Sequence, residues 1–199
     1  VKRERRILGE QDVVIRPHVG EQIPDELFSQ MYEIYLTTID KYAWARRYLT
    51  PEFFDLLRER FRHNLCFFTA SRAGKLLAGT FNVQKSGALY GRYWGTHEEV
   101  RFLHFNVCYY AAIEHCIEAG LQRFEPGAGG DFKWLRGFDA EETRSMHWFQ
   151  DPRLGDAVSR FLVAERGEVE RVIAGAAERS PLRKSDPGPD LLLAPDLSK

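Results

Sequence analysis

The sequence predicts one α/β domain in which a mixed, mostly antiparallel sheet is flanked by helices. Its 199 residues match the length of a single domain, usually about 100–200 residues. A hydrophobic fraction of 44%, with 13% aromatic residues, supplies a sizeable core. Apolar residues at helical spacing alternate with short β-branched or aromatic runs, as expected when helices and strands share one chain.

The first quarter of the chain predicts a strand followed by two helices. Residues 12–16 are a short β-branched run that can open a sheet. Residues 24–41 begin with proline and carry apolar side chains at helical spacing. Thr50 and Pro51 supply a cap and a first-turn proline for a second helix that reaches about Phe61.

Three strands joined by tight turns follow these helices. Residues 65–70 and 76–84 flank the polar turn 71–75, which predicts a hairpin. After the turn 85–87, residues 88–95 are rich in aromatic side chains, as strands commonly are. Together these segments predict an antiparallel meander.

A largely buried helix and a returning strand complete the predicted sheet. The helix is predicted from apolar residues at helical spacing, namely Leu103, Val107, Tyr110, Ile113 and Ile117. Gly120 suits its C-terminal cap, and residues 121–125 read as a strand beside the third one.

The remaining sequence predicts a loop, a strand, a helix and a tail. Residues 126–139 are glycine-rich and lack periodicity, residues 142–149 have strand character, and Asp151 and Pro152 start a last helix. We expect residues 1–11 to be a basic linker from an upstream domain, residues 12–177 the folded domain, and residues 178–199 a disordered, proline-rich tail. The order of elements is that of the acetyltransferase (GNAT) fold.

Composition argues against several classes of protein. Lys and Arg number 28 against 29 Asp and Glu, so no whole-molecule field favours nucleic acid or an anionic membrane. We see no apolar run of the roughly 18–20 residues that a membrane-spanning helix needs, and no signal peptide, so we expect a cytoplasmic protein. We expect the cysteines to be reduced core thiols, and the histidines show no metal-ligand spacing. The cysteines are Cys66, Cys108 and Cys116.

The loop that follows residues 121–125 is the first candidate for a functional site. Ligands of α/β sheets often bind the loops beyond strand ends, and glycines let backbone N–H groups approach an anion or a carbonyl. Residues 123–138 (RFEPGAGGDFKWLRGF) have this character. The alternative is a solvated surface loop.

Several segments in order resemble the FemAB-like predicted N-acyltransferases. They are residues 48–54 (YLTPEFF), 89–95 (LYGRYWG), 102–105 (FLHF), the loop 123–138, residues 142–148 (ETRSMHW) and the basic run near Lys2. The resemblance extends to about Val172. It implies a bacterial protein of two tandem acetyltransferase-like domains, with this chain as the second.

The resemblance also implies transfer of an acyl or aminoacyl group to an amine, in peptidoglycan or cell-wall peptide biosynthesis. No tightly bound cofactor is implied; the donor is aminoacyl-tRNA or acyl-CoA. The pair Phe132-Lys133 matches a Phe-Lys pair in relatives that extend peptidoglycan peptides with aminoacyl-tRNA. The narrower family has a longer acidic-His-Lys variant, so Phe132 is a departure toward those relatives.

Candidate site residues follow from the loop, the resemblance and the aromatic strand. Lys133 is the candidate cation for the carbonyl oxygen, and Glu125 the candidate proton acceptor. Candidate substrate-binding residues are Phe132, Arg136, Gly127, Gly129, Gly130, Arg92, Tyr93, Trp94 and His104. The alternative roles are core aromatics for Tyr93 and Trp94, a helix residue with satisfied hydrogen bonds for His104, and a partner of a surface carboxylate for Arg92.

The segment before the central helix bears on the donor. Acetyl-CoA enzymes of this fold hold pyrophosphate with a Gln/Arg-x-x-Gly-x-Gly/Ala loop, whereas residues 95–101 here read GTHEEVR. We expect Glu98 and Glu99 at the helix N-terminus to disfavour phosphate there, so a tRNA ester, or a donor held by the upstream domain, fits better. The alternatives are an acyl-CoA-dependent acetyltransferase and a non-catalytic module that binds a peptide or tRNA.

Overall fold

The computed structural model describes residues 1–41, 46–127 and 131–179. It comprises two compact units, Val1–Ala128 and Gly129–Lys199, each described here by itself. The first unit contains α1 (Lys2–Gly9), β1 (Val14–Val19), η1 (Gly20–Gln22), α2 (Asp25–Ile39), α3 (Pro51–Arg60), η2 (Arg62–Asn64), β2 (Leu65–Arg72), β3 (Lys75–Lys85), β4 (Ala88–Thr96), α4 (Leu103–Phe105), η3 (Asn106–Tyr110), α5 (Ala111–Glu118) and β5 (Arg123–Glu125). The second contains η4 (Asp131–Arg136) and α6 (Pro152–Arg179).

The first unit is built on one sheet with the strand order β1-β2-β3-β4-β5. The first four strands form an antiparallel meander, and β5 joins β4 in parallel. The helix around Val107 packs on this sheet, so the predicted mixed sheet is confirmed. The order of its elements and the parallel return of β5 are those of the acetyltransferase fold.

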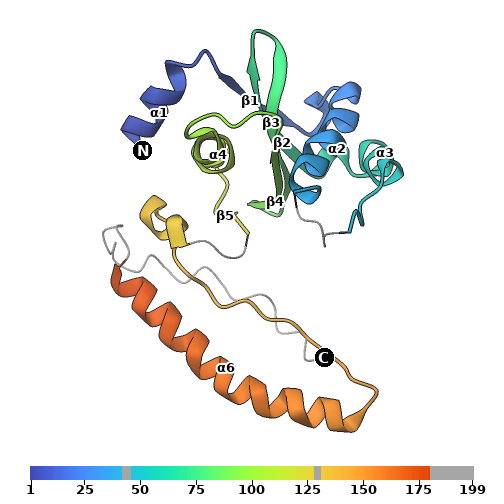
Figure 1. Cartoon of the computed structure of the whole chain (residues 1–199), viewed down its shortest axis with the longest axis vertical. Helices are drawn as coiled ribbons and strands as arrows, with labels where there is room; N and C mark the ends of the chain where they lie inside the picture. Colours follow the sequence, from blue (N-terminus) through green and yellow to red (C-terminus); the bar gives the residue numbers. More distant parts are fainter. Residues whose placement is uncertain (42–45, 128–130, 180–199) are drawn as a thin grey trace. The chain divides into compact units, whose positions relative to one another are not determined.

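Helices cover both faces of this sheet, as Figure 1 shows. On one face, the helix made of α4, η3 and α5 packs with Leu8 of α1 over Cys66, Phe68 and Leu89. On the other face, α2 and α3 pack over Phe67 and Phe81. Both faces of the sheet are therefore covered, which explains why residues 65–70 are all buried rather than alternately buried and exposed.

Helix α2 is tied to β4 by threonine side chains. The Thr38 hydroxyl donates to the Trp94 carbonyl at 2.6 Å, and the Thr37 oxygen accepts from the Thr96 N–H at 3.0 Å. The N–H of His97 donates to Leu77 on the β3 side. Because backbone groups alternate along a strand, those of Trp94 and Thr96 point to the opposite edge of β4. Helix α2 therefore satisfies two backbone groups that no strand reaches.

The N-terminal segment is a helix, and the last predicted strand does not form. Residues 2–9 form a helix whose Leu8 is buried in the core, and the expected link of residues 1–11 to an upstream domain stays a prediction. Residues 142–149 form no strand, and the prediction of one was wrong. Their β-branched and aromatic content alone does not make a strand, because a strand needs a neighbour that accepts its hydrogen bonds. From residue 180 onward, the expected tail lies outside the described residues.

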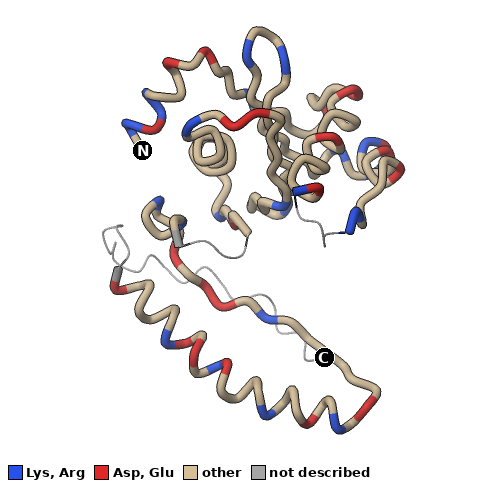
Figure 2. Tube along the Cα trace, viewed as in Figure 1, with Lys and Arg blue, Asp and Glu red and all other residues tan. Residues whose placement is uncertain are grey.

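Positive and negative side chains are mixed along the whole described chain. Figure 2 shows Lys and Arg interspersed with Asp and Glu in both units. Along α6 the two signs are mixed, and Arg171 pairs with Glu168 at 2.6 Å. Among the described helices, none is both long enough and apolar enough to cross a membrane.

We predict that Gly95→Ala destabilises the chain, because a Cβ there would lie 2.0 Å from the Ile34 carbonyl oxygen of α2. Overpacking of this kind costs about 1–3 kcal/mol, and chemical denaturation will measure it. Gly9→Ala is the matched control: a Cβ at Gly9 meets nothing within 4 Å, so this variant will be as stable as the wild type or slightly more so. Equal stabilities of the two variants would contradict the close contact of α2 with β4.

Candidate functional site

The candidate site is a cleft that opens where β4 and β5 diverge. Strand β5 pairs with β4 only at Ala88–Tyr90, whereas β4 continues to Thr96. A β-bulge at this point leaves Arg92 without a partner on β3, since Phe81 pairs with Tyr93 and Asn82 with Gly91. Divergence and bulge together open a space beside the sheet that no strand fills.

The cleft has a volume of about 90 Å³ and is lined by residues of four elements. Strand β4 supplies Gly91–Trp94, β3 supplies Thr80 and Asn82, the helix supplies His104, Cys108 and Tyr109, and the β5 end supplies Phe124 and Pro126. Four residues predicted from the sequence therefore come together here: Arg92, Tyr93, Trp94 and His104.

A π-helical turn shapes the helical wall of the cleft. η3 interrupts the α-helix between α4 and α5, and π-turns follow an i to i+5 pattern. The ring of Tyr109 accordingly lies 5.5 Å from that of His104, five residues earlier. The His104 ring also lies 5.1 Å from that of Trp94. Three aromatic side chains thus form one continuous wall.

The Tyr93 ring belongs to the other face of the sheet. It packs on Tyr35 with a centroid distance of 5.2 Å, and its hydroxyl donates to the Tyr48 hydroxyl at 3.4 Å. Burial, and then the contact with Tyr48, raises the pKa of Tyr93. It is therefore a neutral hydroxyl at physiological pH and contributes to the cleft as part of β4.

Arg92 and Glu125 lie at the margin of the cleft. The Arg92 side chain is exposed, with its guanidinium 5.6 Å from the centre of the Tyr90 ring. Glu125 is paired with Arg123 at 3.0 Å and is not among the lining residues, although Phe124 and Pro126 are. Alternation along the strand directs Glu125 to the opposite face. Its role as proton acceptor remains a prediction.

The floor of the cleft is polar, and its residues were not among those predicted from the sequence. Thr80 and Asn82 are each only 3% exposed, on the helix-covered face of β3. The Asn82 Nδ2 donates to the Cys66 carbonyl at 2.9 Å and to the Thr80 oxygen at 3.0 Å. The signal in the sequence was a pair of polar residues, Thr80 and Asn82, separated by one residue within a largely apolar strand. Polar side chains are uncommon in buried positions and are hydrogen-bonded there, so such a pair is informative.

The predicted loop residues fall into both units. Gly127 is at the end of the first unit with φ +86°, a conformation that favours glycine. Gly129 and Gly130 lie outside the described residues. Phe132, Lys133 and Arg136 belong to η4 of the second unit, where the Arg136 guanidinium donates to the Phe132 carbonyl at 2.8 Å. Lys133 is only 8% exposed, so it is not a solvated loop lysine.

The acidic residues before the central helix lie farther from it than expected. The helix begins at Leu103, so Glu98 and Glu99 are in the preceding loop rather than in the first turn. Glu98 also accepts a hydrogen bond from Arg72 at 2.8 Å. Their repulsion of a phosphate group is therefore weaker than the sequence suggested, because helix-end effects fall off within one turn.

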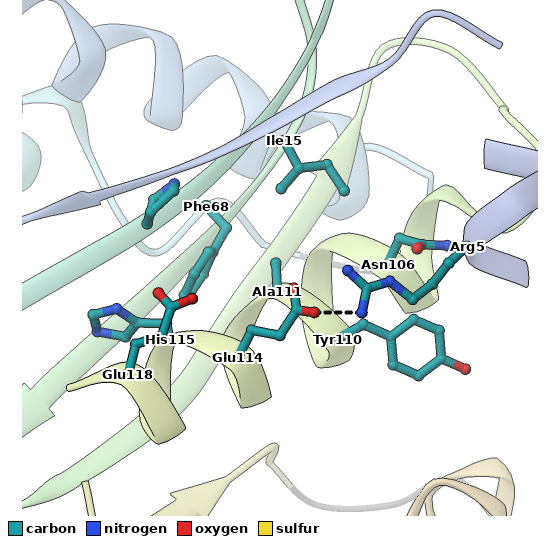
Figure 3. Close-up of a pocket in the computed structure, with 10 residues that line it drawn as sticks. Arg5, Ile15, Phe68, Asn106, Tyr110, Ala111, Glu114, His115 and Glu118 are labelled. Atoms are coloured by element: carbon teal, nitrogen blue, oxygen red, sulfur yellow. Dashed lines mark hydrogen bonds and ion pairs between the residues drawn. The ribbon is translucent and has the colours of Figure 1, made fainter. Parts of the chain in front are cut away.

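A second cavity of about 270 Å³ lies on the other side of the helix, beside α1 and β1. Figure 3 shows Arg5 and Glu114, which form an ion pair, with Phe68 and His115 in the wall. Burial lowers the pKa of His115, and its Nε2 lies 2.8 Å from Gln84 Oε1. None of the residues predicted to act in function lines this cavity. Within the described ranges, no three His, Cys, Asp or Glu side chains form a metal-binding group.

Comparison with known proteins identifies the family. Residues 1–184 match the FemAB-like family, which is described as acting in peptidoglycan biosynthesis/recognition. A search of curated protein sequences finds no match.

Solved structures with similar folds are distant in sequence. An aminoglycoside acetyltransferase from an uncultured soil metagenomic sample, in complex with trehalose, is 11% identical with a TM-score of 0.48, covering 71% of this chain and 98% of its own. A ribosomal-protein-alanine N-acetyltransferase from Brucella melitensis is 15% identical with a TM-score of 0.45, covering 70% and 97%. L-PGS from Bacillus licheniformis is 10% identical with a TM-score of 0.44, covering 62% and 40%.

We predict that the three thiols differ sharply in reactivity. Burial, and then the neighbouring Cys116, raises the pKa of Cys66 to about 12, and burial raises that of Cys116 to about 11. Cys108 is less buried and lines the cleft. Because thiolates are the reactive form, a disulfide reagent at pH 8 will modify one thiol rapidly in the native chain and three after denaturation.

The Cys108→Ala variant will lack the rapid phase. If that phase persists in this variant, the reactive thiol is one of the two that the structure places in the core.

Proposed function

Because this chain belongs to the FemAB-like family, we propose that it is an N-acyltransferase domain whose reaction takes place in the cleft between β4 and β5. The observation that carries the proposal is the part of the β4 edge at Trp94 that α2 leaves unpaired, on a residue that lines the cleft. Strand alternation directs the N–H of Trp94 to the same edge as its carbonyl, away from β3. A fixed N–H at the point where two strands part suits the oxygen of an acyl carbonyl.

The reaction we propose is direct attack. The lone pair of a neutral acceptor amine adds to the carbonyl carbon of an ester or thioester, and the carbonyl oxygen becomes negative. As that oxygen reforms the double bond, the bond to the ribose oxygen or to sulfur breaks. The amine proton leaves with the alcohol or thiol. This reaction needs no covalent enzyme intermediate.

From the resemblance, we propose Lys133 as a cation that stabilises the negative oxygen. Its low exposure of 8% supports this role, because a cation held in a poorly hydrated place acts more strongly on a developing charge than a solvated one does. Phe132, the exposed residue before it in the chain, would position the donor or exclude water. Glu125 remains the proposed proton acceptor, with Arg136 and the loop glycines contacting substrate.

The donor in this proposal is an aminoacyl-tRNA ester, with acyl-CoA as the second candidate. The sequence between β4 and the helix lacks the pyrophosphate-binding pattern of acetyl-CoA enzymes, which favours the ester. The salt bridge of Glu98 with Arg72 removes part of the electrostatic objection to CoA, so that candidate is retained. An upstream acetyltransferase-like domain and the tRNA are the proposed partners, and the proposed acceptor is a small-molecule or peptide amine.

The proposal predicts which molecules accompany the protein and what it can do alone. Native mass spectrometry of the gently purified chain will show an acylated RNA or CoA. If the acceptor site is shared with an upstream domain, the 199-residue chain alone will transfer little acyl group, and adding that domain will restore transfer. Full turnover by the chain alone would refute the shared site, and the absence of transfer by the combined domains would refute the enzyme.

We predict that Lys133→Met lowers the single-turnover rate at saturating donor by at least about 10², as expected when one oxyanion-stabilising group is lost. Methionine keeps an apolar stem of similar length, so thermal denaturation will change little. Lys75→Met is the control, because Lys75 is an exposed lysine at the start of β3. A Lys133→Met variant with the rate of the control would show that the loop cation has no part in the chemical step.

A further inference from the structure

The polar floor of the cleft presents a single hydrogen-bond acceptor. Asn82 Nδ2 donates to the Cys66 carbonyl and to the Thr80 oxygen, so both amide hydrogens are used inside the protein. A backbone carbonyl only accepts, which fixes the nitrogen on that side and the oxygen on the other. Oδ1 of Asn82 makes no hydrogen bond with any described residue.

This oxygen is open to the cleft. Within the described chain, no side-chain oxygen or nitrogen is both fully buried and without a hydrogen-bond partner. The small exposed fraction of Asn82, 3%, therefore includes Oδ1, and Asn82 lines the cleft. Its cross-strand neighbour on β4 is Gly91, which has no side chain to cover it.

The surroundings of the oxygen fit a small cationic group. Trp94 is the cross-strand neighbour of Thr80, and its ring adjoins those of His104 and Tyr109 along the helical wall. Aromatic faces attract cations, and an amide oxygen accepts from an N–H. A volume of about 90 Å³ admits a group of a few heavy atoms.

We propose that Asn82 Oδ1 accepts a hydrogen bond from a non-reacting ammonium group beside the acyl carbon, and so selects aminoacyl donors over plain acyl donors. The attacking amine is a poor fit for this position, because it must be neutral to react. Neither Thr80 nor Asn82 can take a proton from it. This inference rests on the proposed function, to which it adds the residue that distinguishes the two kinds of donor.

Binding of two fragments tests the inference without any transfer step. Glycinamide and propionamide have the same shape, but one carries an ammonium group where the other has a methyl group. The indole N–H signal of Trp94, assigned with Trp94→Phe, will report binding in NMR titrations. Hydrogen bonds to charged groups are worth about 1.5–3 kcal/mol, so glycinamide will bind about 10-fold to 10²-fold more tightly.

Variants test whether Thr80 and Asn82, the floor of the cleft, cause the preference for glycinamide over propionamide. Asn82→Leu will abolish it. Thr80→Val will reduce it several-fold, because the Asn82 amide loses one of its two partners and can turn its nitrogen to the cleft. Thr69→Val is the matched control: Thr69 is a buried threonine of β2 that is absent from the cleft lining, and its variant will keep the full preference.

Equal affinities of the two fragments for the wild-type chain would overturn the inference, as would an unchanged preference in Asn82→Leu. If that variant does not fold, Thr80→Val decides: an unchanged preference there overturns the inference too. Selective binding by a protein without transferase activity would sustain the inference while refuting the enzyme. Transfer from glycyl and propionyl donors at equal efficiency would sustain the proposed enzyme while refuting the inference.

Discussion

The partial pairing of β4 is the constraint on which the site depends. Its partner β3 follows β4 throughout, while β5 leaves after Tyr90, and the bulge at Arg92 turns the rest of the strand. An unpaired strand edge inside a protein is costly. Helix α2 removes part of that cost through Thr37 and Thr38, at a separation that only a glycine at position 95 permits. The remaining edge is left open to a ligand.

The cleft combines two chemistries that favour the same ligand. Its walls are aromatic, and its floor is a buried amide oriented by the backbone of β2. Tyr93 of β4 is neutral because burial raises its pKa. Arg92 is the charged β4 residue of the lining, and its exposed guanidinium lies 5.6 Å from the centre of the Tyr90 ring. The aromatic walls and the amide oxygen are the features on which we base the proposed binding of a carbonyl and a small ammonium group.

In the second unit, η4 holds Lys133 in a poorly exposed position. A short 3-10 turn can do so because its side chains are closely spaced and the Arg136 guanidinium closes it on the Phe132 carbonyl. The functional assignment therefore has two independent parts. Geometry supports the cleft, while resemblance and burial support the lysine.

Periodicity and turn residues in the sequence determined the five strands of the sheet, the central helix and the aromatic residues of β4, because these features depend on local pattern. Residues 142–149 were mispredicted, since a strand also requires a partner far along the chain. Only tertiary structure decided which of those aromatics face the cleft. The bulge at Arg92 and the π-turn at residues 106–110 set the directions of these side chains. The Asn82 amide is oriented by its hydrogen bond to the Cys66 carbonyl of β2. Such orientations arise from contacts between distant segments, which no local pattern encodes.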